Sequence, residues 1–414
     1  MICFVFFLYF NIFINVSLIK SERQKLLLVS LDGFRWDFQK KGYTPNLDWI
    51  VKHGVTVDYV VNVFPTITYP NHQTIVTGLY PEHHGIIGNA MFNKKTGKSF
   101  DMLGEETWNQ STPIWIENQL NGFESGLCYW PGHNVLFNGM KANYTADDKY
   151  ADPYTSPQKN KIMPLEKRIS LVIDWLKKPN VTFVGFYYEE PDETVHRIGV
   201  DVETKKELGN IIFKTDKMIG ELIKEINKEN INVNLIIVGD HGHTTLSYKK
   251  VIYLDKYINL DDALSISGTT FVYIFAKTGY LNHIYNGLKA GQDHFKVFLK
   301  KNIPEELHLK NSDRAPDILV ISSPGWTILK SKNSKEWFQE TNDYWKIGDH
   351  GYEPEFKSMN TVFYAFGPAF KKNYKSQSIR IIDLYSLMCK VLKIPPRKND
   401  GNETMVIQFL NKNI

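Results

Sequence analysis

Short apolar runs alternate with longer segments of helical period over most of the chain. The apolar runs are rich in β-branched and aromatic residues, which favours buried strands. They cover residues 26–31, 181–188, 235–238 and 271–276. The helical segments repeat apolar residues three and four positions apart, so each presents one apolar face. They cover residues 44–53, 72–79, 164–178, 202–230 and 379–394. The alternation predicts an α/β fold: a doubly wound, mostly parallel sheet with helices on both faces.

The first 19 residues are almost wholly apolar, and the polar chain begins at Lys20. This length suits a secretory signal better than a membrane span. We therefore expect a signal peptide over residues 1–20 and one globular domain over residues 25–414. An uncleaved N-terminal anchor and a core helix are the alternatives. No second stretch could span a bilayer, so cleavage would give a secreted, extracellular product without a stable membrane span. Acceptor triplets for N-glycosylation agree with secretion if they are exposed, and they begin at Asn109, Asn143, Asn180 and Asn402.

The composition is that of an ordinary globular protein, with 43% hydrophobic residues and 49 Lys and Arg against 45 Asp and Glu. The chain has no Lys/Arg-rich arm, which disfavours a nucleic-acid duplex as partner. The sequence implies no obligate protein partner. Two cysteines lie outside the presumed signal, Cys128 and Cys389, and they could form a disulfide or remain buried thiols.

Potential metal ligands follow three of the predicted strands. Asp32 ends the first run, Asp192 and His196 follow the second, and Asp240 with His241 follows the third. An open α/β sheet presents its active site at the carboxyl ends of its strands, so these side chains are expected to converge. Carboxylates mixed with imidazoles suit zinc or a similar divalent ion.

The spacing divides these ligands into two groups. Asp192 and His196 lie four residues apart and face the same way if the segment is helical. His350, in a polar Gly-Asp-His-Gly segment, is the natural third ligand of that ion. The second ion would take Asp32, Asp240 and His241, with Thr68 as a labile ligand that becomes a nucleophile. The stretch 130–161 has no clear period and predicts a long loop over this site.

Each of these residues also has a simpler interpretation. A single Asp after a strand is more often a helix N-cap than a ligand, and a Thr before Tyr-Pro-Asn is more often part of a turn. The joint occurrence of the ligands in order favours the metal site. The remaining histidines named here are interpreted as mostly surface or structural: His72, His83, His84, His133 and His243.

Several longer motifs resemble one enzyme family. They are Asp32-Gly-Phe-Arg-Trp, Phe64-Pro-Thr-Ile-Thr-Tyr-Pro-Asn-His, Thr77-Gly-Leu-Tyr-Pro-Glu-His-His-Gly-Ile-Ile-Gly-Asn, Tyr129-Trp-Pro-Gly, Glu189-Glu-Pro-Asp and Gly239-Asp-His-Gly. The chain from about Leu26 to its C-terminus is similar to the ecto-nucleotide pyrophosphatase/phosphodiesterase family, within the alkaline phosphatase superfamily. The resemblance implies an alkaline-phosphatase-like phosphodiesterase catalytic domain with two zinc ions.

The resemblance also implies roles for single residues. Thr68, the second Thr of Pro-Thr-x-Thr, matches the nucleophile, and Asn89 matches a hydrogen-bond donor to the phosphoryl oxygen. Tyr69, Trp130 and Tyr187 match aromatic residues around the nucleotide base. The implied reaction is cleavage of phosphodiester or pyrophosphate bonds in extracellular nucleotides such as ATP, ADP, NAD or dinucleoside polyphosphates, giving 5′-monophosphates.

The chain departs from the family pattern at positions that bear on the substrate. His243 replaces the common Met of Asp-His-Gly-Met, and Ile67 replaces a frequent Lys. Lys159 aligns with a tyrosine of nucleotide-preferring relatives, with Tyr154 nearby. None of these changes removes a ligand. Two alternatives therefore stay open: a choline-type phosphodiesterase acting on lysophospholipids or glycerophosphocholine, and an inactive nucleotide-binding protein.

Overall fold

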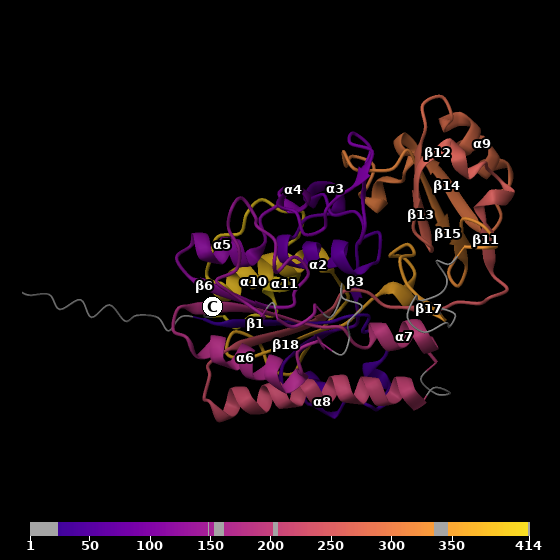
Figure 1. The fold of residues 1–414 in the computed structure, drawn as a ribbon. Helices are drawn as coiled ribbons and strands as arrows, with labels where there is room; N and C mark the ends of the chain where they lie inside the picture. The colour runs from indigo at the N-terminus through magenta and orange to yellow at the C-terminus, as the bar shows by residue number, and fades with distance from the viewer. Residues whose placement is uncertain (1–23, 148, 153–160, 202–205, 335–346, 413–414) are drawn as a thin grey trace, which may run out of the picture.

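The centre of the molecule is an eight-stranded sheet in the computed structural model, which describes residues 24–147, 149–152, 161–201, 206–334 and 347–412 (Figure 1). Its spatial order is β19 (Tyr374–Ser376), β2 (Val55–Val57), β18 (Phe363–Phe366), β9 (Asn234–Gly239), β1 (Leu26–Leu31), β8 (Val181–Tyr188), β6 (Glu124–Cys128) and β7 (Tyr144–Thr145). Only β18 runs antiparallel to its neighbours. The predicted mostly parallel sheet is confirmed.

The central strand β1 is buried on both sides, and its side chains alternate between two cores. Leu26 and Leu28 enter one core, and Leu27, Val29 and Leu31 enter the other. This alternation follows from the two-residue repeat of a strand. Helices cover both faces of the sheet, which accounts for a strand that is apolar at nearly every position. The helices on the first face are α2 (Thr68–Thr77), α5 (Ile114–Leu120) and α10 (Leu384–Leu392). Those on the second face are α1 (Pro45–His53), α6 (Leu165–Lys177) and α8 (Lys206–Lys228).

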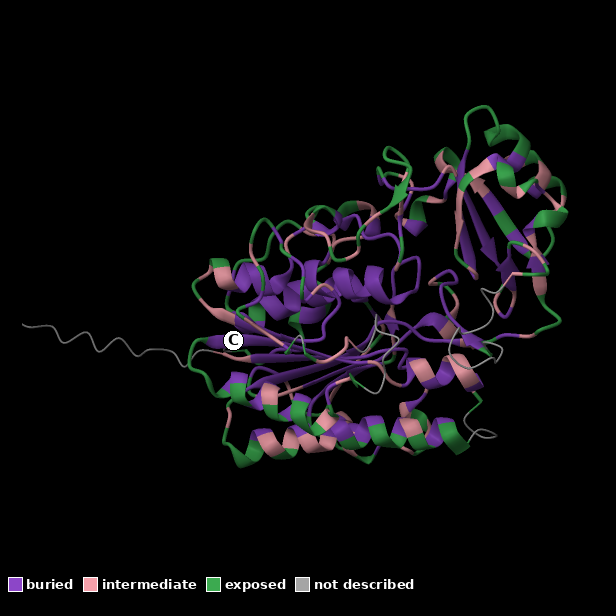
Figure 2. Cartoon of the chain, in the orientation of Figure 1, coloured by how far each residue is buried: buried purple, intermediate pink, exposed green. Residues whose placement is uncertain are grey.

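The long helix α8 shows how the apolar period sets the packing. Its buried positions include Ile212, Ile219 and Ile226, which follow one another at about two helical turns along one side. The opposite side is exposed, as Figure 2 shows for the helix beneath the sheet. The predicted helix 202–230 is therefore present, although residues 202–205 lie outside the described part.

A second, antiparallel sheet forms a smaller lobe on one side of the molecule. Its order is β12 (Ala263–Ser267), β13 (Phe271–Ala276), β15 (Ile318–Ser322) and β14 (Phe295–Leu299), packed with α9 (Leu281–Ala290). The strand predicted at 271–276 is present, but it belongs to this sheet and not to the parallel one. An apolar run of this length has the same pattern in either sheet.

The remaining elements are shorter. They are β3 (Val60–Val61), α3 (Pro81–His84), β4 (Phe92–Asn93), β5 (Lys98–Ser99), α4 (Glu105–Trp108), α7 (Asp192–Ile198), β10 (Thr244–Thr245), β11 (Val251–Tyr253), β16 (Thr327–Leu329), β17 (Gly348–Asp349), β20 (Ile379–Arg380) and α11 (Thr404–Ile407).

Two predicted helices have different bounds in the structure. The helix expected over 72–79 begins four residues earlier, at Thr68, because Pro70 is tolerated in a first helical turn. It ends at Gly78, whose φ of +67° is the left-handed conformation that terminates helices. The amphipathic segment 379–394 is helical only as α10, after a short strand and a 3-10 turn.

Three further expectations concern the termini, the cysteines and the long loop. Within the described ranges, no helix has the length and apolar character needed to cross a bilayer. The predicted signal peptide over 1–20 lies outside those ranges. Cys128 and Cys389 are both buried free thiols, so the disulfide alternative is not realised. The described part of 130–161 is largely irregular and contributes the edge strand β7.

Candidate active site

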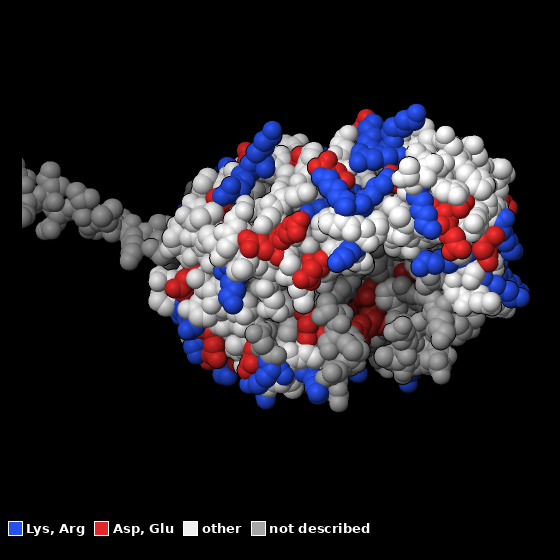
Figure 3. Space-filling view, turned by 45° about the horizontal axis from the view of Figure 1, so that its top comes forward, with Lys and Arg blue, Asp and Glu red and all other residues white. Residues whose placement is uncertain are grey.

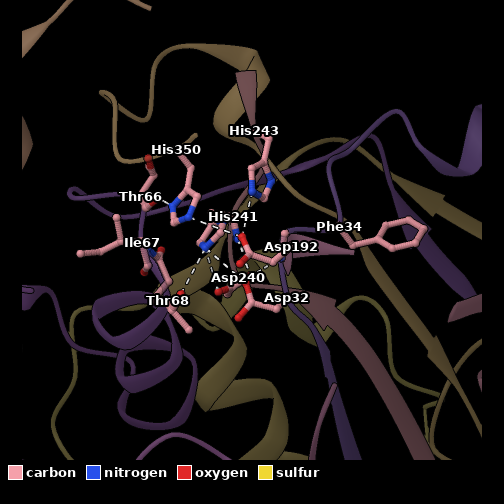
Figure 4. Close-up of polar contacts among 12 residues, drawn as sticks. Asp32, Phe34, Thr66, Ile67, Thr68, Asp192, Asp240, His241, His243 and His350 are labelled. Carbon is pink, nitrogen blue, oxygen red and sulfur yellow. Dashed lines mark hydrogen bonds and ion pairs between the residues drawn. The ribbon is translucent and has the colours of Figure 1, made fainter. Parts of the chain in front are cut away.

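The carboxyl ends of three neighbouring strands bring the predicted ligands together. β1 lies between β8 and β9, and all three run parallel, so their ends share one edge of the sheet. Asp32 and Asp240 follow β1 and β9 directly. Asp192 begins α7 after β8, and its backbone N–H donates to the carbonyl of Asp32 (3.1 Å). Figure 4 shows these carboxylates pointing toward one another.

Two groups of ligand atoms form there. In the first group the Nε2 atoms of His196 and His350 are 3.2 Å apart, and His196 Nε2 is 3.3 Å from Asp192 Oδ2. In the second group His241 Nε2 lies 3.2 Å from Asp240 Oδ2 and 3.4 Å from Asp32 Oδ1. Ligands about 2.1 Å from a tetrahedral zinc ion lie about 3.4 Å from one another, so both spacings suit such an ion.

The predicted pair Asp192 and His196 lies on α7, four residues apart and on one face. His350 reaches them from a distant part of the chain, because β17 lies against the end of α7. The backbone N–H of Ile347 donates to the carbonyl of His196 (2.8 Å), and His196 Nδ1 bonds the carbonyl of Gly348 (2.8 Å).

The tautomers of the three histidines follow from the backbone. Nδ1 of His196, His241 and His350 each contacts a backbone carbonyl, at 2.8, 3.1 and 3.0 Å. A carbonyl can only accept, so Nδ1 carries the proton and Nε2 presents a lone pair. The lone pairs of His196 and His350 therefore face each other across 3.2 Å. A cation between them relieves that repulsion and uses the arrangement that metal-binding histidines have.

The carboxylates also require a positive charge. Asp32 Oδ1, Asp192 Oδ1 and Asp240 Oδ2 are buried and have no hydrogen-bond partner among the described residues. Burial raises the pKa of Asp32, and the charges of Asp240 and Asp192 raise it further. Burial likewise raises the pKa of Asp240 to about 8. Buried uncompensated charge is costly, whereas a divalent ion compensates it. The residues present therefore fit two metal ions.

The imidazoles are held neutral by their surroundings. Burial lowers the pKa of His350 to about 3 and also lowers the pKa of His241. Burial opposes the charged form of Asp192 as well, but His196 and His243 outweigh that effect and lower its pKa. Neutral imidazoles and ionised carboxylates are the forms that bind metal.

Thr68 lies at the second ligand group. It is the first residue of α2, it is buried, and its Oγ1 is 3.4 Å from His241 Nε2. The N-terminus of a helix carries partial positive charge, which favours a phosphate or an alkoxide there. Asn89 lies beside it, because Asn89 Oδ1 accepts from the backbone N–H of Tyr69 (2.9 Å). The amide group of Asn89 is thus held next to the helix start.

The three aromatic residues assigned to a base pocket are mostly enclosed by protein. Tyr69 is 6% exposed and packs beside Trp108. Trp130 is fully buried, with its ring against the edge of His72. Tyr187 is 1% exposed, and its hydroxyl donates to Asp32 Oδ2 (2.6 Å). Trp130 and Tyr187 are thus enclosed by protein, and the role given to them stays a prediction. Lys159 and Tyr154 lie outside the described residues.

One residue at the site was not among the predicted ligands. His243 was grouped with four histidines interpreted as mostly surface or structural, but it is fully buried and belongs to the first ligand group with Asp192, His196 and His350. The atoms these four residues offer all lie within 4.8 Å of one another. The signal in the sequence was the spacing Asp-His-Gly-His, in which a third potential ligand follows the first two. His72 is also buried near the site, with Nε2 2.8 Å from Ser30 Oγ.

On the surface, acidic side chains gather inside a hollow of the face shown in Figure 3. The smaller lobe helps to position His350, since Thr270, just before β13, donates from Oγ1 to the carbonyl of His350 (2.6 Å).

Residues 26–353 match the family model described as type I phosphodiesterase / nucleotide pyrophosphatase. The chain is 36% identical to human ectonucleotide pyrophosphatase/phosphodiesterase family member 5, over 95% of this chain and 79% of that protein. It is also 36% identical to human bis(5′-adenosyl)-triphosphatase ENPP4, over 91% of this chain and 80% of that protein.

A solved structure has the same fold. Murine member 5, an inactive threonine-to-alanine variant in complex with AMP, superposes with a TM-score of 0.84 at 36% identity. The alignment covers 94% of this chain and all of that one. The fold is thus alkaline-phosphatase-like, and the expected resemblance is confirmed. The sequence matches and the structural match cover nearly the same part of the chain. The chain therefore belongs to the type I phosphodiesterase / nucleotide pyrophosphatase family of hydrolases.

Proposed function

We propose that this chain is a secreted phosphodiesterase, dependent on two zinc ions, that cleaves nucleotide phosphodiester and pyrophosphate bonds through Thr68. The observation that carries the proposal is the position of the Thr68 hydroxyl, 3.4 Å from His241 Nε2 at the N-terminus of α2. The murine relative named as inactive after a threonine-to-alanine change, and solved with AMP, supports a threonine nucleophile and a nucleotide substrate.

In the first step the Thr68 oxygen attacks the α-phosphorus of the nucleotide. The bond from Thr68 Oγ1 to phosphorus forms, the bond to the distal group breaks, and a nucleotidyl-threonine results. Asn89, held by its contact with the Tyr69 amide, would donate to the non-bridging oxygen as charge develops there. The helix start would stabilise the same charge.

In the second step water takes the place of the Thr68 oxygen at phosphorus, which releases a 5′-monophosphate and restores the threonine hydroxyl. Asp192, His196 and His350 would hold one ion, and Asp32, Asp240, His241 and Thr68 the other. When bound, such ions would lower the pKa of the Thr68 hydroxyl and of water, so that each could give up its proton to solvent near neutral pH, and they would neutralise the phosphoryl charge.

The substrate class is argued from the relatives. One relative is named a bis(5′-adenosyl)-triphosphatase, and the murine structure holds AMP, which favours nucleotides over choline esters. Secretion is supported by the four acceptor asparagines, all of which are exposed: Asn109, Asn143, Asn180 and Asn402.

The test is hydrolysis of the nitrophenyl ester of thymidine monophosphate beside nitrophenyl phosphorylcholine, each with and without chelator. We expect cleavage of the nucleotide ester alone, lost on chelation and restored by zinc. Preference for the choline ester would keep the chemistry but overturn the substrate. Failure to cleave either ester would favour the nucleotide-binding alternative.

Substitution of Thr68 tests the nucleophile. Thr68→Ala should lower kcat by at least about 1,000-fold, because removal of a nucleophile removes the covalent route. Its zinc content should stay near wild type, since three other ligands remain in that group.

Thr66→Ala is the matched control. The Thr66 hydroxyl is also buried, but it donates to the carbonyl of Tyr352 (2.8 Å) and accepts from the amide of Gly351 (3.0 Å). This variant should still form the nucleotidyl enzyme, detected by mass spectrometry after acid quench. An adduct that forms in Thr68→Ala and not in Thr66→Ala would reassign the nucleophile.

A further inference from the structure

We infer that His243 is a fourth protein ligand of the ion held by Asp192, His196 and His350. The inference rests on the proposed metal site and adds a residue to it. His243 is completely buried, and neither of its ring nitrogens has a hydrogen-bond partner among the described residues. A buried imidazole normally satisfies at least one nitrogen, so the position calls for a partner that the protein atoms do not supply.

The backbone fixes His243 beside His350. β10 pairs with β17 in antiparallel register, with Thr244 opposite Asp349. The next opposed positions are His243 and His350, and their ring centroids lie 4.9 Å apart. Arg35 holds the other side of the segment, because its Nη1 donates to the carbonyl of His243 (3.2 Å). The pairing of β10 with β17 therefore positions both the His243 ring and His350.

The ring nitrogen points toward the ligand group. His243 Nε2 lies 2.8 Å from Asp192 Oδ1, a distance that would suit a hydrogen bond. Both atoms are buried, and both belong to the four-residue group whose offered atoms lie within 4.8 Å of one another. The ligands of one metal ion are grouped in this way. Figure 4 shows His243 and His350 approaching Asp192 from the same side.

Space for the imidazole is created by a glycine next to another ligand. Gly33 follows Asp32 and has a φ of +67°. A Cβ on Gly33 would lie 2.4 Å from Cε1 of His243, so a side chain there would displace the ring. The His243 imidazole thus lies against the backbone of Gly33, between the two ligand groups. On that side, this backbone blocks rotation of the ring away from the ligands.

A fourth protein ligand changes the character of the first ion. Catalytic zinc usually has three protein ligands and an open position, whereas structural zinc has four protein ligands. A site that includes His243 would still admit water, because catalytic zinc can expand to five ligands. With three imidazoles and one carboxylate, the first ion should dissociate more slowly than one held by Asp192, His196 and His350 alone. The second ion, whose fourth ligand would be the hydroxyl of Thr68 and not an imidazole, should leave first on chelation.

The test compares two substitutions in the zinc-loaded enzyme. His243→Ala removes the imidazole. His243→Gln retains an amide that can donate to Asp192 but binds zinc poorly. We expect both variants to lose the first zinc at least about 10-fold faster than wild type to a chromogenic chelator, since even ligand-supporting residues affect metal affinity by about 10–100-fold. His84→Gln, which removes another buried imidazole outside the ligand groups, should release zinc at the wild-type rate.

A crystal structure of the zinc-loaded enzyme, with anomalous scattering at the zinc edge, gives the direct result. A distance of about 2.0–2.1 Å from His243 Nε2 to the ion would establish coordination. A distance beyond 3 Å, with His243→Gln retaining zinc as wild type does, would overturn the inference and leave His243 as a positioning residue for Asp192. If wild type binds no zinc at all, the proposed function itself fails, which is a different outcome.

Discussion

At the scale of single residues, the site is defined by polar atoms that lack partners. Three buried carboxylate oxygens and both nitrogens of His243 are unpaired in the described structure, whereas Nδ1 of His196, His241 and His350 each contacts a carbonyl. Of the eleven buried side-chain atoms without a hydrogen-bond partner among the described residues, these five lie in the two ligand groups, and the other six lie on residues outside them. The clustering of ionisable atoms without hydrogen-bond partners at one place supports metal binding more directly than residue type does, because buried uncompensated charge is costly.

Tyr187 provides a prediction at this scale. Tyr187→Phe keeps the ring but removes the hydroxyl that donates to Asp32 (2.6 Å). We expect zinc affinity of the second group to fall about 10-fold or more, because a ligating carboxylate loses its supporting hydrogen bond. The measurement is competition with a chelator of known affinity. A base-stacking role would give the opposite pattern: Tyr187→Phe would keep both zinc affinity and KM.

At the scale of elements, the first ligand group depends on the contact between α7 and β17. Gly348 on β17 approaches α7 so closely that a Cβ would lie 2.3 Å from the carbonyl oxygen of Val195. The same strand carries His350 at its end and accepts from His196 at the Gly348 carbonyl. The lack of a side chain at Gly348 therefore lets α7 and β17 approach closely, and this approach sets the distance between His196 and His350.

Gly348→Ala should separate α7 from β17. We expect a loss of about 1–3 kcal/mol in the free energy of unfolding, as for other overpacked contacts, and weaker zinc binding in the first group. Chemical denaturation and zinc titration measure the two effects. Ile347→Ala is the control, because Ile347 is 36% exposed and joins His196 through its backbone. Equal zinc loss in both variants would contradict this explanation.

At the scale of the whole molecule, buried histidines outside the ligand groups couple stability to pH. Burial lowers the pKa of His84 to about 3. Its Nδ1 accepts from the backbone N–H of Ile86 (3.1 Å), and its Nε2 contacts Thr74 Oγ1 (3.0 Å). Protonation at Nδ1 would break the bond to Ile86. The folded protein therefore favours the neutral ring.

The sign of the effect follows from the two pKa values. The unfolded chain binds a proton at His84 near pH 6.5, and the folded protein only near pH 3. The stability contributed by the neutral ring is thus fully present above pH 6.5 and is lost as the pH falls toward 3. We expect His84→Gln to unfold at a lower temperature than wild type at pH 7, with the difference shrinking toward pH 4.

Thermal unfolding at several pH values measures this change. His53→Gln serves as the control, because His53 is exposed and its substitution should leave the pH dependence unchanged. A gap between wild type and His84→Gln that stays constant from pH 7 to pH 4 would show that His84 is not the titrating group.

The sequence by itself determined the local elements and the chemistry at their ends. The strands at 26–31 and 181–188 lie at the predicted positions, because apolar runs of that length can be buried on both faces only in a covered parallel sheet. Asp32 and Asp240 follow such strands directly, so their convergence was predictable from strand direction alone.

The tertiary structure decided what depends on contacts between distant segments. The strand at 271–276 joined a second sheet because its pairing partners lie elsewhere in the chain. His243 entered the ligand group because β10 pairs with β17, more than 100 residues later. Tyr187 turned toward Asp32 because β8 lies beside β1. Periodicity specifies which face of an element is apolar, but only the packing of elements specifies what each side chain meets.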